Sequence, residues 1–400
     1  MGANAIWISP IVANTDDGYH GYWLKDLNQI NPHFGTEDDL HDLVSACHAK
    51  DIWVMVDVVG NHVGPVGTDY SQINPFNKAE YYHDSCVISD SDFLNNQHNV
   101  EVCRLAGLPD LNQDNAFVRS TLLNWIQNLV TIYSLDGIRI DTIPEVEHSF
   151  WQEFSKSAGV FTLGEVFDGR KNYVAGYQGD IDATLNYPLY FKMKDVFLSG
   201  HAMNEIEGFY HDMQVFKDQS VLGCFIDNHD NARFLSMNND LALFRSYITF
   251  NLGALGIPII YYGSEQGFAG AGDPHNREAI WNNFDSNHQL YKYIQTILKA
   301  RSTIQWHQEQ QIQRYSDADF YAFSRGKALF AFTNKKGQVV KTVTSHPYQE
   351  ADILCNVFDN TDCITVKNKQ FNVYLNNGEA KIFVPKGSLG EARYFLSIDE

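Results

Sequence analysis

The chain has 400 residues, of which 44% are hydrophobic and 14% aromatic, so it can bury a large core and is expected to form two or three domains. Its 29 basic and 49 acidic residues give a formal net charge of −20, which disfavours binding to nucleic acid or to an anionic membrane surface. The sequence lacks the roughly 18 continuous apolar residues of a membrane span and opens without a signal-peptide pattern. We therefore expect a protein without a membrane span, acting on a neutral substrate.

Short apolar runs alternate with longer amphipathic stretches from residue 5 to about residue 298. This alternation predicts a parallel sheet of strand and helix units, either closed into a barrel or doubly wound. The predicted strands are 5–8, 52–56, 137–140, 161–163, 222–226 and 259–262. The predicted helices are 37–50, 116–133, 150–158, 241–252 and 289–301. One polar stretch, 62–112, shows no clear helix and is predicted to be a subdomain inserted into the barrel.

Beyond residue 313 the apolar spacing changes from helical to alternating. Residues 320–325 and 328–332 flank a Gly326-Lys327 turn, which is typical of a β-hairpin. Further strands are predicted at 339–343, 363–366, 371–374 and 380–384, so this part is expected to be an antiparallel sandwich. The predicted domains are the barrel (1–61 and 113–313), the inserted subdomain (62–112) and the all-β domain (314–400).

The positions of the six cysteines favour two short-range disulfides. Cys86 and Cys103 flank one polar loop, and Cys355 and Cys363 flank another. Cys47 lies in a helical pattern and Cys224 in an apolar strand, and both are expected to be free, buried thiols. Two such bridges suit an oxidising compartment, with unpaired cytosolic cysteines as the alternative.

Three carboxylates each follow a short apolar run: Asp141, Glu165 and Asp230. Because parallel strands bring the groups at their carboxyl ends to one edge of a sheet, these acids are expected to share a cleft. Each acid taken alone is more often a helix cap or a surface charge. Three acids in one pattern favour the functional interpretation.

The neighbours of these acids suggest different protonation states. Arg139 precedes Asp141 by two residues on a predicted strand, so it points to the same side and keeps the carboxylate anionic, as a nucleophile requires. Glu165 has no basic neighbour in the sequence and ends an apolar run, a setting that raises a carboxyl pKa as a general acid needs. Asp230 follows Asn228 and His229, which can hydrogen-bond sugar hydroxyls. Two carboxyls of opposed protonation are the requirement for glycoside cleavage.

Several motifs in this order resemble those of the α-amylase family, glycoside hydrolase family 13. They are DVVGNH at 57–62, LPDL at 108–111, GIRID at 137–141, GEV at 164–166 and FIDNHD at 225–230. The likeness is greatest to fungal α-amylases, through YHGYW at 19–23, the loop 86–103 and GDPHNR at 272–277. The resemblance spans nearly the whole chain. It implies an α/β fold, a (β/α)8 TIM-type barrel with an inserted loop subdomain and a C-terminal antiparallel β-sandwich.

The resemblance also implies an activity and a set of site residues. Asp141 is implied to be the nucleophile, Glu165 the acid/base and Asp230 the transition-state stabiliser in retaining endo-hydrolysis of α-1,4-glucosidic bonds in starch and glycogen. The implied substrate-binding residues are His20, Tyr22, Trp23, His62, Arg139, His229, Asp273 and Arg277. Outside this family likeness, such histidines are more often structural, an aromatic pair is more often core and an Asp–Arg pair is a surface ion pair.

A structural calcium ion is the cofactor that the resemblance implies. Its side-chain ligands would be Asn61, Glu101 and Asp110, with the backbone carbonyl of Glu145 as a further ligand, and oxygen donors suit this hard cation. The implied protein is secreted, and we expect it to act as a monomer on a polysaccharide or oligosaccharide substrate, without a nucleic-acid partner.

Two features of the chain depart from the family pattern. Pro144-Glu145 stands where many relatives have Lys-His, which removes hydrogen-bond donors from the acceptor side of the cleft. Residues 1–10 resemble the second strand of the family, so the first β/α unit is expected to be absent, and this exact chain is then expected to have low solubility and activity. The alternatives are a 4-α-glucanotransferase, which uses the same intermediate, and an inactive glucan-binding protein or fragment. A hydrolytic metal centre is disfavoured because the Asp and His residues lack a compact ligand spacing.

Overall fold

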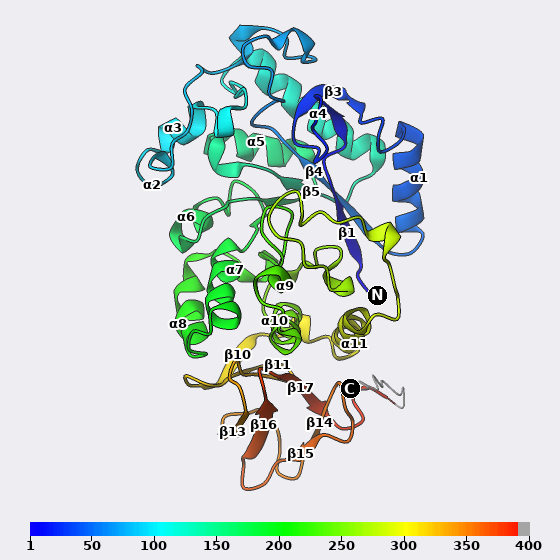
Figure 1. Ribbon diagram of the computed structural model, residues 1–400, viewed down its shortest axis with the longest axis vertical. Helices are drawn as coiled ribbons and strands as arrows, with labels where there is room; N and C mark the ends of the chain where they lie inside the picture. The colour runs from blue at the N-terminus through cyan, green and yellow to red at the C-terminus, as the bar shows by residue number, and fades with distance from the viewer. Residues whose placement is uncertain (391–400) are drawn as a thin grey trace. The chain divides into compact units, whose positions relative to one another are not determined.

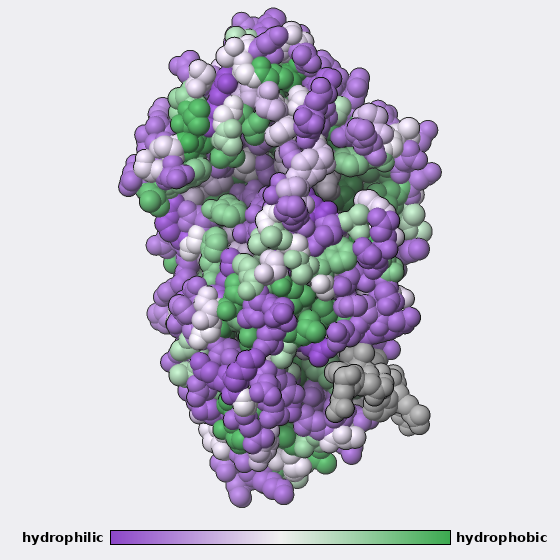
Figure 2. All heavy atoms as spheres, viewed as in Figure 1, coloured by the Kyte–Doolittle hydropathy of each residue, from purple (hydrophilic) through white to green (hydrophobic). Residues whose placement is uncertain are grey.

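The computed structural model describes residues 1–390, and its contacts divide the chain into two units. The N-terminal unit comprises Ala3–Leu185, and the C-terminal unit comprises Asn186–Glu400 together with Met1–Gly2. The last ten residues of the predicted 314–400 domain lie outside the described residues. Within the described part, no helix has the length and apolar character needed to cross a membrane. Hydrophilic residues cover much of the visible face, as the acidic composition predicts (Figure 2).

A five-stranded parallel sheet forms the centre of the N-terminal unit (Figure 1). Its strands, in spatial order, are β1 (Ala5–Ile8), β4 (Trp53–Val58), β5 (Gly137–Ile140), β6 (Phe161–Gly164) and β7 (Ala183–Thr184). The helices of this unit are α1 (Glu37–His48), α2 (Asp92–Asn95), α3 (Gln97–Val102), α4 (Ala116–Tyr133), α5 (His148–Ala158) and α6 (Lys171–Gly176). Because β5 is buried along its whole length, its residues are apolar apart from Arg139, a pattern typical of a central parallel strand.

Local signals explain why the predicted helices lie where they do. The N-cap Asn115 accepts hydrogen bonds from the first backbone amides of α4, and Ser134 ends the helix in the left-handed conformation. A capping box between Thr36 and Asp39 begins α1. These local signals lie in the sequence itself, so the predicted bounds of α4 are correct and those of α1 differ only at the C-terminal end.

The segment 62–112 is irregular, as predicted, but it is not free of helices. The short helices α2 and α3 lie within it, and their length explains why no helical periodicity is visible in the sequence. The predicted disulfides Cys86–Cys103 and Cys355–Cys363 are both present. Cys47 and Cys224 are free, although Cys47 is only half-buried.

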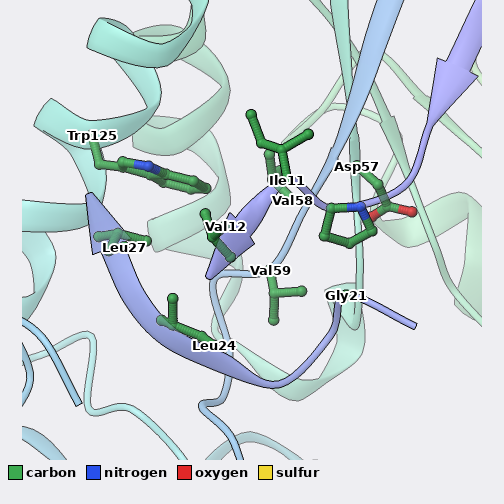
Figure 3. A pocket seen from close by; sticks show the side chains of 10 residues that line it. Ile11, Val12, Gly21, Leu24, Leu27, Asp57, Val58, Val59 and Trp125 are labelled. Carbon is green, nitrogen blue, oxygen red and sulfur yellow. The ribbon is translucent and has the colours of Figure 1, made fainter. Parts of the chain in front are cut away.

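An apolar pocket lies beside the carboxyl end of β4. A hairpin of β2 (Val12–Asn14) and β3 (Leu24–Ile30), absent from the predicted elements, supplies part of its wall. Val12, Leu24, Val59 and the indole of Trp125 line the pocket, and Asp57 lies at its edge (Figure 3).

The C-terminal unit begins with further barrel-type elements. Its helices are α7 (Tyr187–Met193), a π-helical turn Lys194–Leu198, α8 (Glu205–Asp212), α9 (Phe234–Met237), α10 (Leu241–Gly253) and α11 (Gln289–Ile304). Two short parallel strands, β8 (Gly223–Cys224) and β9 (Ile257–Pro258), pair with one another. The strand predicted at 259–262 is therefore wrong in position. The amides of Ile257 and Ile259 donate to the carbonyls of Leu222 and Cys224, so Pro258 occupies a position whose amide hydrogen the pairing does not use.

Two antiparallel sheets form the end of the described chain. One has the order β10 (Gln311–Ser316), β11 (Tyr321–Arg325), β12 (Ala328–Phe332), β17 (Ala380–Pro385), β14 (Ile353–Asn356) and β15 (Cys363–Thr365), and the other pairs β13 (Gln338–Val343) with β16 (Phe371–Asn376). Leu329 and Phe383 from the first sheet share a buried cluster with Val343 and Val373 from the second. The sheets thus pack face to face as the predicted sandwich.

Candidate active site

The central feature of the N-terminal unit is a fully buried guanidinium that meets three carboxylates. Arg139 Nη1 lies 2.9 Å from Asp57 Oδ1 and 2.8 Å from Asp141 Oδ1, and its Nη2 lies 2.8 Å from Glu165 Oε2. The strand order explains this meeting, because Arg139 pairs in register with Asp57 on β4, and Glu165 directly follows β6 on the other side. The structure therefore brings together the predicted nucleophile and the predicted acid.

The Glu165 carboxyl has the environment of a group that holds a proton. Burial raises the pKa of Glu165 to about 7, because the desolvation of the carboxylate outweighs its attraction to Arg139, and the nearby charge of Asp141 raises it further. Glu165 also shares a side-chain hydrogen bond with Asp141. One member of this pair is thus poised to carry a proton while the other is stabilised as an anion by Arg139.

Asp57 is a buried member of this cluster to which the sequence analysis assigned no role. Its Oδ2 accepts hydrogen bonds from the Tyr22 hydroxyl at 2.7 Å and from Trp7 Nε1 at 3.1 Å. Burial raises the pKa of Asp57 to about 6, with Arg139 opposing the shift. The signal that could have revealed it is its position on β4, where Asp is the single charged residue of a strand that is otherwise apolar.

The aromatic residues expected to contact sugar lie against one another, and the Tyr22 hydroxyl joins them to Asp57 and Arg139. The His20 ring lies 5.8 Å from that of Tyr22 in a stacked arrangement and 4.8 Å from that of Trp23 in an edge-on arrangement. The Arg139 guanidinium lies 5.8 Å from the centre of the Tyr22 ring. Tyr22 and Trp23 are half-buried, so they are neither core residues nor fully exposed ones.

His62 makes the backbone contact that a structural histidine would make. Its Nε2 lies 3.1 Å from the Tyr22 carbonyl, and because a carbonyl only accepts, Nε2 carries the proton. Burial lowers the pKa of His62 to about 4, so the ring is neutral and Nδ1 is left to accept a hydrogen bond from the Asn61 amide at 3.3 Å. If the Asn61 amide were swapped, its oxygen would face His62 Nδ1, which would then have to carry the proton. The unprotonated Nε2 of the neutral ring would then face the Tyr22 carbonyl, and two acceptors would meet.

This orientation of Asn61 creates a cluster of oxygen atoms. Its Oδ1 lies 2.8 Å from Asp110 Oδ1 and 3.1 Å from the carbonyl oxygen of Glu145, whereas the swapped amide would donate its N–H groups to these two oxygens. His83 Nδ1 contacts the other Asp110 oxygen at 2.6 Å and fixes that carboxylate. Calcium prefers oxygen ligands, so the oxygen atoms of Asn61, Asp110 and the Glu145 carbonyl fit this cation.

Glu101, the remaining predicted calcium ligand, contacts Gln97. Its Oε1 accepts from Gln97 Nε2 at 3.0 Å, and the same nitrogen donates to the Pro144 carbonyl at 2.9 Å. Gln97 thus links Glu101 to Pro144, the residue that precedes Glu145. Within residues 1–390, no group of three or more His, Cys, Asp or Glu side chains is arranged to hold a metal.

The third acid, Asp230, lies in the C-terminal unit with two of its predicted companions. His229 Nε2 is 3.1 Å from Asp230 Oδ2, and Arg277 Nη2 is 3.9 Å from Asp230 Oδ1. Arg277 also pairs with Asp273 through Nε. The fully buried Asn276, which the sequence analysis did not single out, lies within 3.3 Å of the carbonyls of residues 228, 229 and 231, so it holds this segment in place.

Comparison with known proteins agrees with this architecture. The family model for the alpha amylase catalytic domain matches residues 1–328. The chain is 36% identical to Alpha-amylase 2 of Schwanniomyces occidentalis, over 96% of this chain and 81% of that protein. The solved alpha-amylase of Malbranchea cinnamomea matches with a TM-score of 0.92 and 36% identity, over 98% of this chain and 87% of that one. An alpha-amylase of Geobacillus thermoleovorans, solved in complex with acarbose, matches with a TM-score of 0.85 and 28% identity, over 96% and 88%.

These relatives confirm the predicted fold class, a TIM-type barrel with a C-terminal antiparallel domain. They match over most of their own length as well as over most of this chain. This chain belongs to the alpha-amylase family.

Proposed function

We propose that this protein hydrolyses internal α-1,4-glucosidic bonds of starch, glycogen and related α-glucans with retention of configuration. The observation that carries the proposal is the pair formed by Asp141 and Glu165, which face one guanidinium and share a side-chain hydrogen bond. Retaining enzymes need their two carboxyls only about 5 Å apart, whereas inverting enzymes need roughly 6.5–9.5 Å. Carboxyls that share a hydrogen bond are close enough for the first mechanism and too close for the second.

The roles follow from this pair. Asp141, whose negative charge is stabilised by Arg139, attacks the anomeric carbon and forms the covalent glycosyl intermediate. Glu165 gives its proton to the departing sugar oxygen and then, as a carboxylate, takes a proton from the attacking water. The role of Asp230 as transition-state stabiliser rests on its motif and on its contacts with His229 and Arg277.

The sugar-contacting residues belong to the same proposal. The half-buried rings of Tyr22 and Trp23 offer faces on which a sugar ring can stack. We assign hydroxyl contacts to His20, His229, Asp273 and Arg277, whereas both ring nitrogens of His62 are taken by Tyr22 and Asn61. The two disulfides favour an extracellular site of action, as for a secreted enzyme.

Product analysis with maltoheptaose tests the reaction type. Hydrolysis with retention should first release shorter maltooligosaccharides in the α-anomeric form, which NMR can follow before mutarotation. Early β-anomers would contradict the retaining mechanism. Products longer than maltoheptaose would instead favour the glucanotransferase, in which a sugar takes the place of the attacking water.

The pH dependence of kcat/KM is a first quantitative prediction. Glu165 must be protonated to act as the acid, and its raised pKa means that the neutral form dominates below about pH 7 and the carboxylate above it. We therefore expect kcat/KM to fall by about tenfold per pH unit as the pH rises above about 7. A profile that stays flat between pH 6 and pH 9 would rule out this assignment.

Calcium dependence is a second prediction, and the ion would be structural. Asn61, Asp110 and the Glu145 carbonyl would hold it and so join the inserted segment to the barrel. A chelator is expected to lower the Tm by roughly 5 °C, and added calcium should restore it. Asp110→Ala should abolish this response, whereas the control Asp114→Asn, at an exposed position, should keep it. An unchanged Tm in chelator would count against the site.

A further inference from the structure

Trp281 is almost fully exposed although tryptophan is among the most costly side chains to leave in water. It lies in a single 3-10 turn, η9 (Ile280–Asn282), and 81% of its surface is accessible. Phe284, three residues later, is 54% exposed and meets the Tyr291 ring edge-on at 5.8 Å. Neighbouring exposed aromatic side chains of this kind mark a binding surface rather than a packing requirement.

The loop that carries Trp281 is anchored on both sides. Before it, Glu278 pairs with the fully buried Arg233 at 2.8 Å and accepts a hydrogen bond from the backbone amide of Gly270. After it, the backbone amide of Asp285 donates to Gln266 Oε1 at 2.9 Å. These anchors hold the backbone on either side, so the indole is presented on a fixed platform.

The platform continues directly from the Asp230 cluster within the same unit. Arg277, which contacts Asp230 and Asp273, precedes Trp281 by four residues, so their Cα atoms are at most about 14 Å apart. A polymer chain bound at Arg277 therefore needs only a few more sugar rings to reach Trp281.

The chemistry of the segment selects a neutral, hydroxyl-rich ligand. Residues 279–287 include Asn282, Asn283 and Asn287, a single acid and no lysine or arginine. The amides can hydrogen-bond hydroxyl groups, whereas a phosphate-bearing ligand would meet no compensating cation. The flat faces of Trp281 and Phe284 suit the apolar faces of sugar rings.

We propose that Trp281, with Phe284, forms an outlying stacking subsite that binds an α-glucan chain beyond the sugars contacted by Arg277. This inference rests on the proposed function, because the same glucan must run from the cleft to the platform. The subsite gives the enzyme a preference for long chains over short oligosaccharides.

Trp281→Ala is the test, with Trp281→Phe as a partial rescue and Trp53→Ala as the control. Trp53 is also strongly exposed, at 64%, but lies in the N-terminal unit. The loss of one stacking contact should raise KM for amylose and starch about 3- to 10-fold in Trp281→Ala, with an unchanged kcat. The increase in KM of Trp281→Ala should become smaller as the maltooligosaccharide substrate becomes shorter. Trp53→Ala should leave KM for starch unchanged.

Gel electrophoresis through immobilised amylose gives a second readout that does not need turnover. Wild-type protein should be retarded more strongly than Trp281→Ala, and equal Tm values would confirm that both are folded. Equal retardation of wild-type protein and Trp281→Ala, or an unchanged KM for starch in the variant, would overturn the proposed subsite. Both results would be expected if the platform bound a protein partner instead. If wild-type protein were retarded but cleaved no glucan, the proposed function would fail while the subsite stood.

Discussion

Glu165→Gln is expected to lower kcat on starch by about 10³- to 10⁴-fold, because the amide has almost the shape of the carboxyl group but cannot donate the catalytic proton. In contrast, kcat/KM should fall much less on an α-maltooligosaccharide with an acidic phenol as its leaving group, since that oxygen departs without protonation, while kcat stays low because Glu165 also activates the water that releases the intermediate. Stopped assays on both substrates, with Tm as a check on folding, would measure the two effects.

The control for this variant is Glu153→Gln. Glu153 is 52% exposed and pairs with Arg119 at the surface, so its loss should leave kcat unchanged and cost less than about 1 kcal/mol of stability. Equal losses of kcat/KM on starch and on the aryl substrate in Glu165→Gln would contradict a role in proton donation. They would instead indicate that Glu165 only supports the position of Arg139.

Long, strongly patterned elements could be predicted from the sequence with good bounds. The helix α4 was predicted with its observed limits because an Asn cap precedes its apolar repeat and Ser134 ends it. Strand β7, by contrast, has two residues, which is too short for any alternation to be visible, and it is defined only by its pairing with β6. Elements that depend on a distant partner in this way cannot be derived from local periodicity.

The candidate site likewise contains features that local sequence predicts and features that depend on distant contacts. The three candidate acids could be named because each follows an apolar run, and the pairing of Asp141 with Arg139 could be predicted from their spacing of two residues. The contact between Arg139 and Glu165 could not, because it requires β6 to lie beside β5. Asp57 carries a local signal, as the single charged residue of an apolar strand, but its contacts with Trp7 and Tyr22 come from other parts of the chain and could not be predicted.

Arg139→Gln is the second variant for which a large effect is expected, because one side chain contacts three buried carboxyl groups. Its removal leaves Asp57, Asp141 and Glu165 without their cation, and breaking a buried ion pair typically costs 3–5 kcal/mol. We expect the free energy of unfolding, measured in urea, to fall by about that amount, and kcat to fall below one-hundredth of its original value. The attraction to Arg139 lowers the pKa of Glu165, so any remaining activity should lose its protonated acid at a higher pH than in the parent.

The comparison of Arg139→Gln with Arg170→Gln separates burial from simple charge loss. Arg170 pairs with Asp168 at 2.6 Å, as closely as Arg139 meets its partners, but it is 42% exposed. Water can solvate Asp168 when Arg170 is removed, so that variant should lose less than about 1 kcal/mol. Arg139→Lys should recover part of the stability, because it restores a positive charge, but little activity, because a single ammonium group cannot span Asp57, Asp141 and Glu165 as the guanidinium does. Equal stability losses in Arg139→Gln and Arg170→Gln would contradict the buried network.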